Sequence, residues 1–171
     1  MRVVNLFAGP GTGKSTTAAA LFAELKYQDH DVELVREFAK DLVWQKRQQD
    51  MRIPGFILGE QIYRMETVAP QVKLVVTDSP LLLTRVYDSS KALGQLALDV
   101  HNRYDSLNIF LKRVKAYNPN GRNETEEQAR MKDAEIFSML ETLKIPFVHV
   151  TANRNAVPVI VKLINEKGWL Q

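Results

Sequence analysis

The strongest constraint in this sequence is a glycine-rich segment between an apolar run and a predicted helix. Residues 9–16 read Gly-Pro-Gly-Thr-Gly-Lys-Ser-Thr, directly after the apolar run 3–7 and before an alanine-rich stretch. Glycines permit backbone conformations that bring several N–H groups onto one anion, and the following helix adds the positive end of its dipole. A strand, such a loop and a helix in this order predict a phosphate-binding P-loop.

The residue types in this loop also predict its ligands. Lys14 places a positive charge at the β- and γ-phosphates of a nucleoside triphosphate, and the Ser15 hydroxyl is a ligand for Mg²⁺. Ala8 stands where the first glycine of the motif is usual, so Gly9 is expected to take up part of the tight turn. We therefore predict that ATP and Mg²⁺ bind here, and that the nucleotide is contacted by Gly9, Gly11, Thr12, Gly13, Lys14, Ser15 and Thr16.

Along the rest of the chain, short apolar runs alternate with longer amphipathic stretches. After the first strand, this pattern predicts strands over 31–36, 73–77, 107–111 and 146–150. It predicts helices over 16–26, 38–46, 56–68, 124–143 and 156–166, with two more within 81–104. Alternation of this kind is typical of a parallel sheet covered by helices. We expect a P-loop NTPase fold in a single domain over 1–171, a three-layer α/β/α sandwich with a five-stranded parallel sheet.

Composition excludes some classes of site. The 171 residues include no cysteine, which rules out disulfides, thiolate metal sites and thiol catalysis. No apolar run reaches the roughly 18 residues that span a bilayer, and the first residues lack the pattern of a signal peptide. We therefore expect a cytoplasmic protein with no membrane partner. The net charge of +3 says little about a polyanionic partner. Oligomeric state stays open between monomer and homodimer.

A carboxylate follows the most apolar central run. Asp78 comes directly after 74–77, Leu-Val-Val-Thr, which is the Walker B arrangement, in which the carboxylate holds Mg²⁺ or its water. Asp-Ser-Pro is also a good helix start, so Asp78 has a second interpretation as a helix cap, and the two are compatible. We predict that Ser15 and Asp78 together bind the metal.

The residues around these motifs favour a kinase over other P-loop proteins. Ser79 follows Asp78 where motor-type ATPases usually have a glutamate. The guanine-reading N/T-K-x-D sequence of Ras-type GTPases is absent, and the short chain leaves little room for the extra helical domain of AAA-type machines. A kinase needs a carboxylate that faces its acceptor, a polar acceptor pocket and basic residues over the phosphates.

Candidates for the first two parts lie after the second strand and on the next helix. Glu37 follows the strand at the edge where open α/β sheets bind ligands, and it could accept the proton of an acceptor hydroxyl. Its other interpretation is a first-turn glutamate favoured by the helix dipole. Arg36 could neutralise a phosphate, while Gln61 and Arg64 could contact the substrate from the polar side of the helix; Gln61 could equally be an ordinary exposed glutamine.

Basic residues gather around a turn signal late in the chain. The segment 112–130 contains Lys112, Arg113, Lys115, Arg122 and Arg130, with Asn-Pro-Asn-Gly at 118–121. We predict a lid there, in which Arg122 and Arg113 close on the transferred phosphoryl group as catalytic residues beside Lys14 and Glu37. The alternative is a solvated charged face.

With these motifs, the sequence resembles small P-loop kinases of the nucleoside and nucleotide (thymidylate) kinase class. It resembles in particular the NadR-like ATPase/kinase domains common in bacteriophages. The resemblance covers nearly the whole chain, and the segments that carry it are 5–17, 32–39, 77–80 and 117–123. In deoxynucleoside kinases a glutamate after the second strand is the base, and Glu37 matches that place. Those enzymes also carry an arginine in the third-strand motif, where this chain reads Asp-Ser-Pro, so the phosphate contact of that arginine is not implied.

The resemblance leaves the phosphate acceptor open. Phage members of this class include kinases that phosphorylate 5-hydroxymethyluracil within DNA, and other members act on free nucleosides or nucleotides or resemble nicotinamide riboside kinases. The partner implied is a nucleoside-type acceptor or modified DNA. The basic residues Lys46, Arg47 and Arg52 lean slightly toward a polyanionic acceptor. A P-loop NTPase that hydrolyses ATP to regulate a partner remains the alternative from another class.

Overall fold

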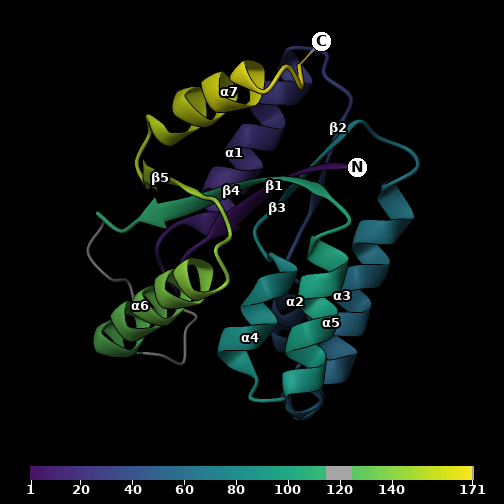
Figure 1. Ribbon diagram of the computed structural model, residues 1–171, viewed down its shortest axis with the longest axis vertical. Helices are drawn as coiled ribbons and strands as arrows, with labels where there is room; N and C mark the ends of the chain where they lie inside the picture. The colour runs from purple at the N-terminus through teal and green to yellow at the C-terminus, as the bar shows by residue number, and fades with distance from the viewer. Residues whose placement is uncertain (115–124, 171) are drawn as a thin grey trace.

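The computed structural model describes residues 1–114 and 125–170, in which five parallel strands form one sheet (Figure 1). The strands are β1 (Arg2–Phe7), β2 (Val32–Val35), β3 (Leu74–Thr77), β4 (Asp105–Lys112) and β5 (Val148–Thr151). They lie in the order β2-β3-β1-β4-β5, with β1 in the centre. All pairings are parallel, and β1 pairs with both β3 and β4. The predicted five-stranded parallel sheet is confirmed.

Helices cover both faces of the sheet, which confirms the three-layer sandwich. One face carries α1 (Lys14–Tyr27) and α7 (Ala156–Glu166), which pack against each other as well as on the sheet. The other face carries the remaining helices, as Figure 1 shows. These are α2 (Phe38–Trp44), α3 (Pro54–Val68), α4 (Thr84–Tyr87), α5 (Lys91–His101) and α6 (Glu126–Thr142), with the short 3₁₀ helices η1 (Gln48–Arg52) and η2 (Leu81–Leu83).

The sequence of β1 explains why the sheet is buried on both sides. Successive side chains of a strand point to opposite faces, and every residue after Arg2 in β1 is buried. Val4 and Leu6 join the core under α1 and α7. Phe7 packs instead against Ile136 and Leu140 of α6 on the opposite face. The sequence of a central strand in a parallel sheet is therefore almost entirely apolar.

Two helix starts differ from the sequence-based expectation. The glycine-rich loop ends earlier than expected, because α1 already begins at Lys14. The helix expected over 56–68 also begins two residues earlier, since α3 starts at Pro54. Proline is favoured in the first turn of a helix because its missing N–H would have no intrahelical partner there. None of the described helices combines the length and apolar character that crossing a bilayer requires.

The parallel strands bring the predicted site residues to one edge of the sheet. The chain leaves β1, β2, β3 and β4 at their carboxyl ends just before Gly9, Glu37, Asp78 and Arg113, respectively. The carboxyl edge of an open parallel sheet is where ligands bind in this architecture.

Candidate active site

The glycine-rich loop wraps around the amino end of α1. Gly11 and Gly13 have φ angles of 78° and 115°, which side chains other than glycine rarely adopt. Gly13 is the N-cap of α1, and no side chain in the described part of the chain caps this helix. The first-turn N–H groups of α1 therefore lack a side-chain acceptor, as an anion-binding loop requires.

Lys14 is the first residue of α1, and its side chain folds back onto the loop. Its Nζ donates to the carbonyl oxygens of Ala8, at 2.7 Å, and Gly9, at 3.4 Å. Ala8, in place of the usual glycine, is fully buried in the core under α1. Its side chain thus fits where the motif usually has none, and its carbonyl still holds the lysine.

Three carboxylates surround the charge of Lys14. Burial lowers the pKa of the Lys14 ammonium, while the negative charges of Glu37, Asp78 and Asp133 act in the opposite direction. Arg113 adds a smaller lowering effect on the same pKa. The site therefore brings the P-loop lysine together with acidic groups that follow β2 and β3 and with one from α6.

Asp78 and Glu37 are linked directly. Asp78 is buried at the end of β3, and its Oδ1 accepts a hydrogen bond of 3.0 Å from the backbone N–H of Glu37. The interpretation of Asp78 as the cap of the next helix is wrong, because Pro80 is the N-cap residue of η2.

The interpretation of Glu37 as a first-turn residue is also wrong, because Glu37 is the N-cap residue of α2. Ser15 and Thr16, the other predicted ligand residues, are exposed at the start of α1.

Gln61 is buried and reaches the same junction from α3. Its Oε1 accepts from Phe38 N–H at 3.1 Å, and its Nε2 donates to the Arg36 carbonyl at 3.3 Å. It is therefore not an exposed helical glutamine. Contact with a substrate through this amide stays a prediction.

The two predicted substrate arginines meet at a carboxylate that sequence reasoning missed. Asp41 pairs with Arg64 at 2.8 Å and with Arg36 at 3.6 Å. The Arg64 guanidinium also lies 4.9 Å from the centre of the Phe38 ring, which stacks edge-on against Phe56. The sequence contained one indication of this cluster. Asp41 comes four residues after Glu37, so the two carboxylates are expected on the same side of a helix.

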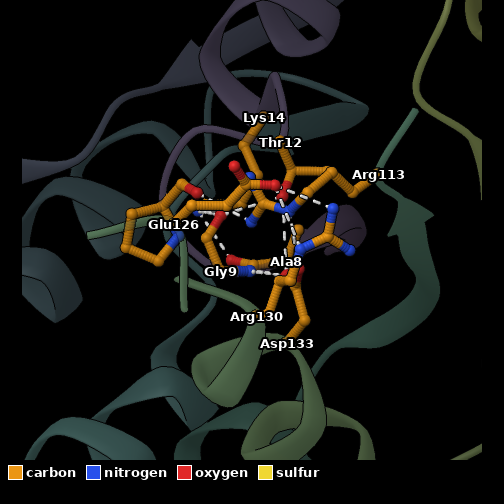
Figure 2. A network of polar contacts seen from close by, with 9 residues as sticks. Ala8, Gly9, Thr12, Lys14, Arg113, Glu126, Arg130 and Asp133 are labelled. Atoms are coloured by element: carbon orange, nitrogen blue, oxygen red, sulfur yellow. Dashed lines mark hydrogen bonds and ion pairs between the residues drawn. The ribbon is translucent and has the colours of Figure 1, made fainter. Parts of the chain in front are cut away.

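Arg113 is placed differently from the predicted lid arginine. It follows β4 directly, and its side chain is only 5% exposed. Its Nε donates to Asp133 of α6 at 2.9 Å, and its Nη2 donates to the Pro10 carbonyl at 2.8 Å (Figure 2). The remaining guanidinium nitrogen, Nη1, is buried without a hydrogen-bond partner in the described structure. Arg113 is therefore held against the P-loop, and its predicted role in a lid and in catalysis stays a prediction.

Asp133 is the second residue that sequence reasoning missed. Its Oδ1 accepts from Gly9 N–H at 2.6 Å and lies 3.5 Å from the Thr12 hydroxyl. A side chain at Gly9 would lie 2.6 Å from the carbonyl oxygen of Ala129 and 2.8 Å from Asp133. Glycine is thus required at position 9 because α6 packs against the loop. Asp133 is one of several acidic residues in a charged helix, so the sequence gives no signal of this contact.

The structure describes only part of the predicted lid. Arg122 and Lys115 lie outside the described residues. Arg130 lies on the exposed side of α6, where it pairs with Glu126 at 2.8 Å. The lid over 112–130 therefore stays a prediction.

Comparison with known proteins agrees with this fold. A family model described as an AAA domain matches residues 3–156. Two structures of a deoxyadenosine kinase from M. mycoides resemble the fold. The form with bound dATP has 16% identity and a TM-score of 0.62, and the match covers 96% of this chain and all of that one. The form with dCMP and dCDP has 15% identity and a TM-score of 0.60, and the match covers 97% of this chain and all of that one. The sequence matches no curated protein.

Proposed function

The chain belongs to the AAA-domain family of nucleotide-binding proteins, and we propose that it is an ATP-dependent kinase for a nucleoside-type acceptor. The observation that carries this proposal is the position of Glu37. Its backbone N–H is bonded to Asp78, and its carboxylate acts on the charge of the P-loop lysine. A carboxylate beside the phosphate site, following a strand other than the one that leads into the P-loop, is suited to activate an acceptor.

In this proposal, the P-loop binds ATP, which is the phosphoryl donor. The amides of the loop and Lys14 hold the triphosphate, and the buried third nitrogen of Arg113 supplies a further donor for a phosphate oxygen. Mg²⁺ fits the residues present, because it commonly uses one or two carboxylates together with a hydroxyl, waters and phosphate oxygens. Ser15 and Asp78 would hold it, and it would neutralise charge on the phosphates.

The proposed reaction is the transfer of the γ-phosphoryl group of ATP to the acceptor hydroxyl. The acceptor hydroxyl oxygen attacks the γ-phosphorus, and the bond from that phosphorus to the bridging oxygen breaks so that ADP leaves. The proton of the hydroxyl passes to the Glu37 carboxylate, while Lys14 and Arg113 stabilise charge on the phosphate oxygens. Ser79 stands beside Asp78 where a hydrolytic ATPase would need a carboxylate to activate water, which favours transfer over hydrolysis.

The acceptor side lies at the junction of β2, α2 and α3. Arg36 and Arg64, bridged by Asp41, offer donors to a sugar or phosphate. The exposed Phe56 ring, which packs edge-on against the buried Phe38, offers apolar surface for a base. The similar fold of a deoxyadenosine kinase supports a nucleoside-type acceptor. A free nucleoside or nucleotide is our first candidate.

A hydroxymethylated pyrimidine within phage DNA is the second candidate acceptor. The observation that favours it is the stretch after α2, where Trp44 is 75% exposed and Lys46, Arg47 and Arg52 are exposed nearby in sequence. Exposed aromatic and basic side chains are typical of surfaces that bind single-stranded or flipped-out nucleotides.

Transfer of label from ATP tests the proposal. ATP labelled in its γ-phosphate is offered with deoxynucleosides, deoxynucleoside monophosphates and DNA that contains 5-hydroxymethyl pyrimidine, each separately. We expect label in at least one free nucleoside or nucleotide, and none with Lys14→Ala, a variant that should still fold. Label only in DNA would favour the second candidate. Phosphate release without an acceptor, and no labelled product, would contradict the kinase proposal.

A further inference from the structure

Gln61 lies on α3, yet its side chain is bonded to the backbone on both sides of Glu37. The hydrogen bonds run from Phe38 N–H to Oε1 and from Nε2 to the Arg36 carbonyl. The residue is only 4% exposed. A side-chain amide can accept at one end and donate at the other, so one glutamine satisfies a buried donor and a buried acceptor together.

This backbone needs such support because of where it lies in the fold. Glu37 has φ −60° and ψ 120°, so the chain here has left the ladder of β2 and has not yet entered α2. Backbone polar groups in such a junction need partners from side chains. Asp78 supplies the partner for the N–H of Glu37 itself. Three consecutive residues, 36–38, are thus held by two buried side chains from β3 and α3.

We propose that Gln61 is a positioning residue for the Glu37 carboxylate, acting through the backbone of residues 36–38 and not through contact with the acceptor. The inference rests on the proposed function, in which Glu37 accepts the acceptor proton. A shift of about 1 Å in a reacting group can cost about 100-fold in rate, so fixing this backbone has a direct catalytic consequence.

The test combines substitutions at Gln61 and Glu37. Gln61→Met has similar length and no hydrogen-bonding amide. Gln61→Glu keeps an acceptor for Phe38 N–H and loses the donor to Arg36. Each is made alone and in the Glu37→Gln background. Gln71→Met is the matched control, because this exposed glutamine follows α3 and, within the described structure, its side chain donates to the nearby Thr67 carbonyl.

For each variant, kcat and the acceptor KM are measured with ATP and with the deoxynucleosides, monophosphates and hydroxymethylpyrimidine DNA named above. We expect Gln61→Met to lower kcat by about 10- to 100-fold, with acceptor KM and ATP affinity changed by less than about twofold. In the Glu37→Gln background the same change should have no further effect, because no base remains to be positioned. Gln71→Met should match the unsubstituted protein.

Other results would overturn the inference in recognisable ways. An unchanged kcat, an equal loss in both backgrounds, or a raised acceptor KM alone would show that Gln61 does not act through Glu37, while the kinase function would stand. Full activity of Glu37→Gln, or no transfer by the unsubstituted protein, would defeat the base role or the proposed function itself, and the inference with it. If Gln61→Met does not fold, Gln61→Glu supplies the same comparison.

Discussion

At the scale of single residues, Asp78 shows how one side chain can serve both the backbone and the nucleotide site. It is buried, it accepts from the N–H of Glu37, and its charge acts on Lys14. A purely structural role would need only the acceptor oxygen, whereas a metal-binding role needs the charge. These two requirements can be separated by a substitution that keeps the oxygen.

Asp78→Asn makes this separation. The asparagine oxygen can still accept from Glu37 N–H, so we expect thermal unfolding to change little. Loss of the charge should raise the Mg²⁺ concentration at half-maximal activity by about tenfold or more. The measurement is a Mg²⁺ titration of phosphoryl transfer. An unchanged titration would leave Asp78 with the backbone role alone.

The buried ammonium group of Lys14 leads us to predict that ATP affinity depends on pH. Burial lowers the pKa of its ammonium in the folded protein, so the proton is lost at a lower pH than from an exposed lysine. The charge that holds the phosphates is present below this pKa and is lost as pH rises through it. ATP affinity, measured by calorimetry across alkaline pH, should therefore fall before ordinary lysines titrate. Lys14→Arg should remove this fall, since a guanidinium stays charged.

At the scale of elements, α6 is connected to the P-loop by the Asp133 carboxylate. Asp133→Ala removes the partner of the buried Arg113 guanidinium and of Gly9 N–H. Breaking a buried ion pair from one side is strongly destabilising, so we expect a loss of about 3 kcal/mol in the free energy of unfolding. The measurement is urea unfolding of both proteins.

An exposed pair on the same helix provides the control. Arg130 and Glu126 have side chains that are 64% and 50% exposed, so Arg130→Ala should cost less than about 1 kcal/mol. Equal losses for the two variants would mean that Asp133 is only an ordinary surface carboxylate of α6.

Elements were predicted well from the sequence where the signal was local. The apolar runs predicted all five strands and the parallel sheet, and the glycine-rich loop predicted the start of α1 to within two residues. Contacts between distant elements gave no such signal. Asp133 meets Gly9 across 124 positions, and Gln61 meets the residues beside Glu37 from another helix. Such pairs are set by how helices pack on the sheet, which periodicity along one segment does not encode.

At the scale of the whole molecule, the sheet gathers the donor and acceptor sides at one edge. The P-loop follows the central strand, and the predicted base follows β2, an edge strand separated from β1 by β3 alone. Asp78 lies at the end of that intervening strand and bonds to the Glu37 backbone. The strand order, more than any single motif, therefore brings the P-loop lysine and the Glu37 carboxylate to the same edge of the sheet.

The two candidate acceptors place different demands on the charge of the whole molecule. A DNA acceptor must be held through its phosphates, and each contact releases counterions, so three contacts would weaken binding about 40-fold between about 50 and 200 mM salt. A free nucleoside, the unphosphorylated form of our first candidate, has no such phosphates, and the following expectation is for that form. Since the net charge is only +3, we expect the acceptor KM to change less than about twofold over that range at saturating ATP. The measurement is steady-state transfer at several salt concentrations, with the KM for ATP followed in parallel because ATP is itself an anion. A steep rise of the acceptor KM, with the ATP value steady, would contradict the free-nucleoside candidate and point to the basic and aromatic stretch after α2.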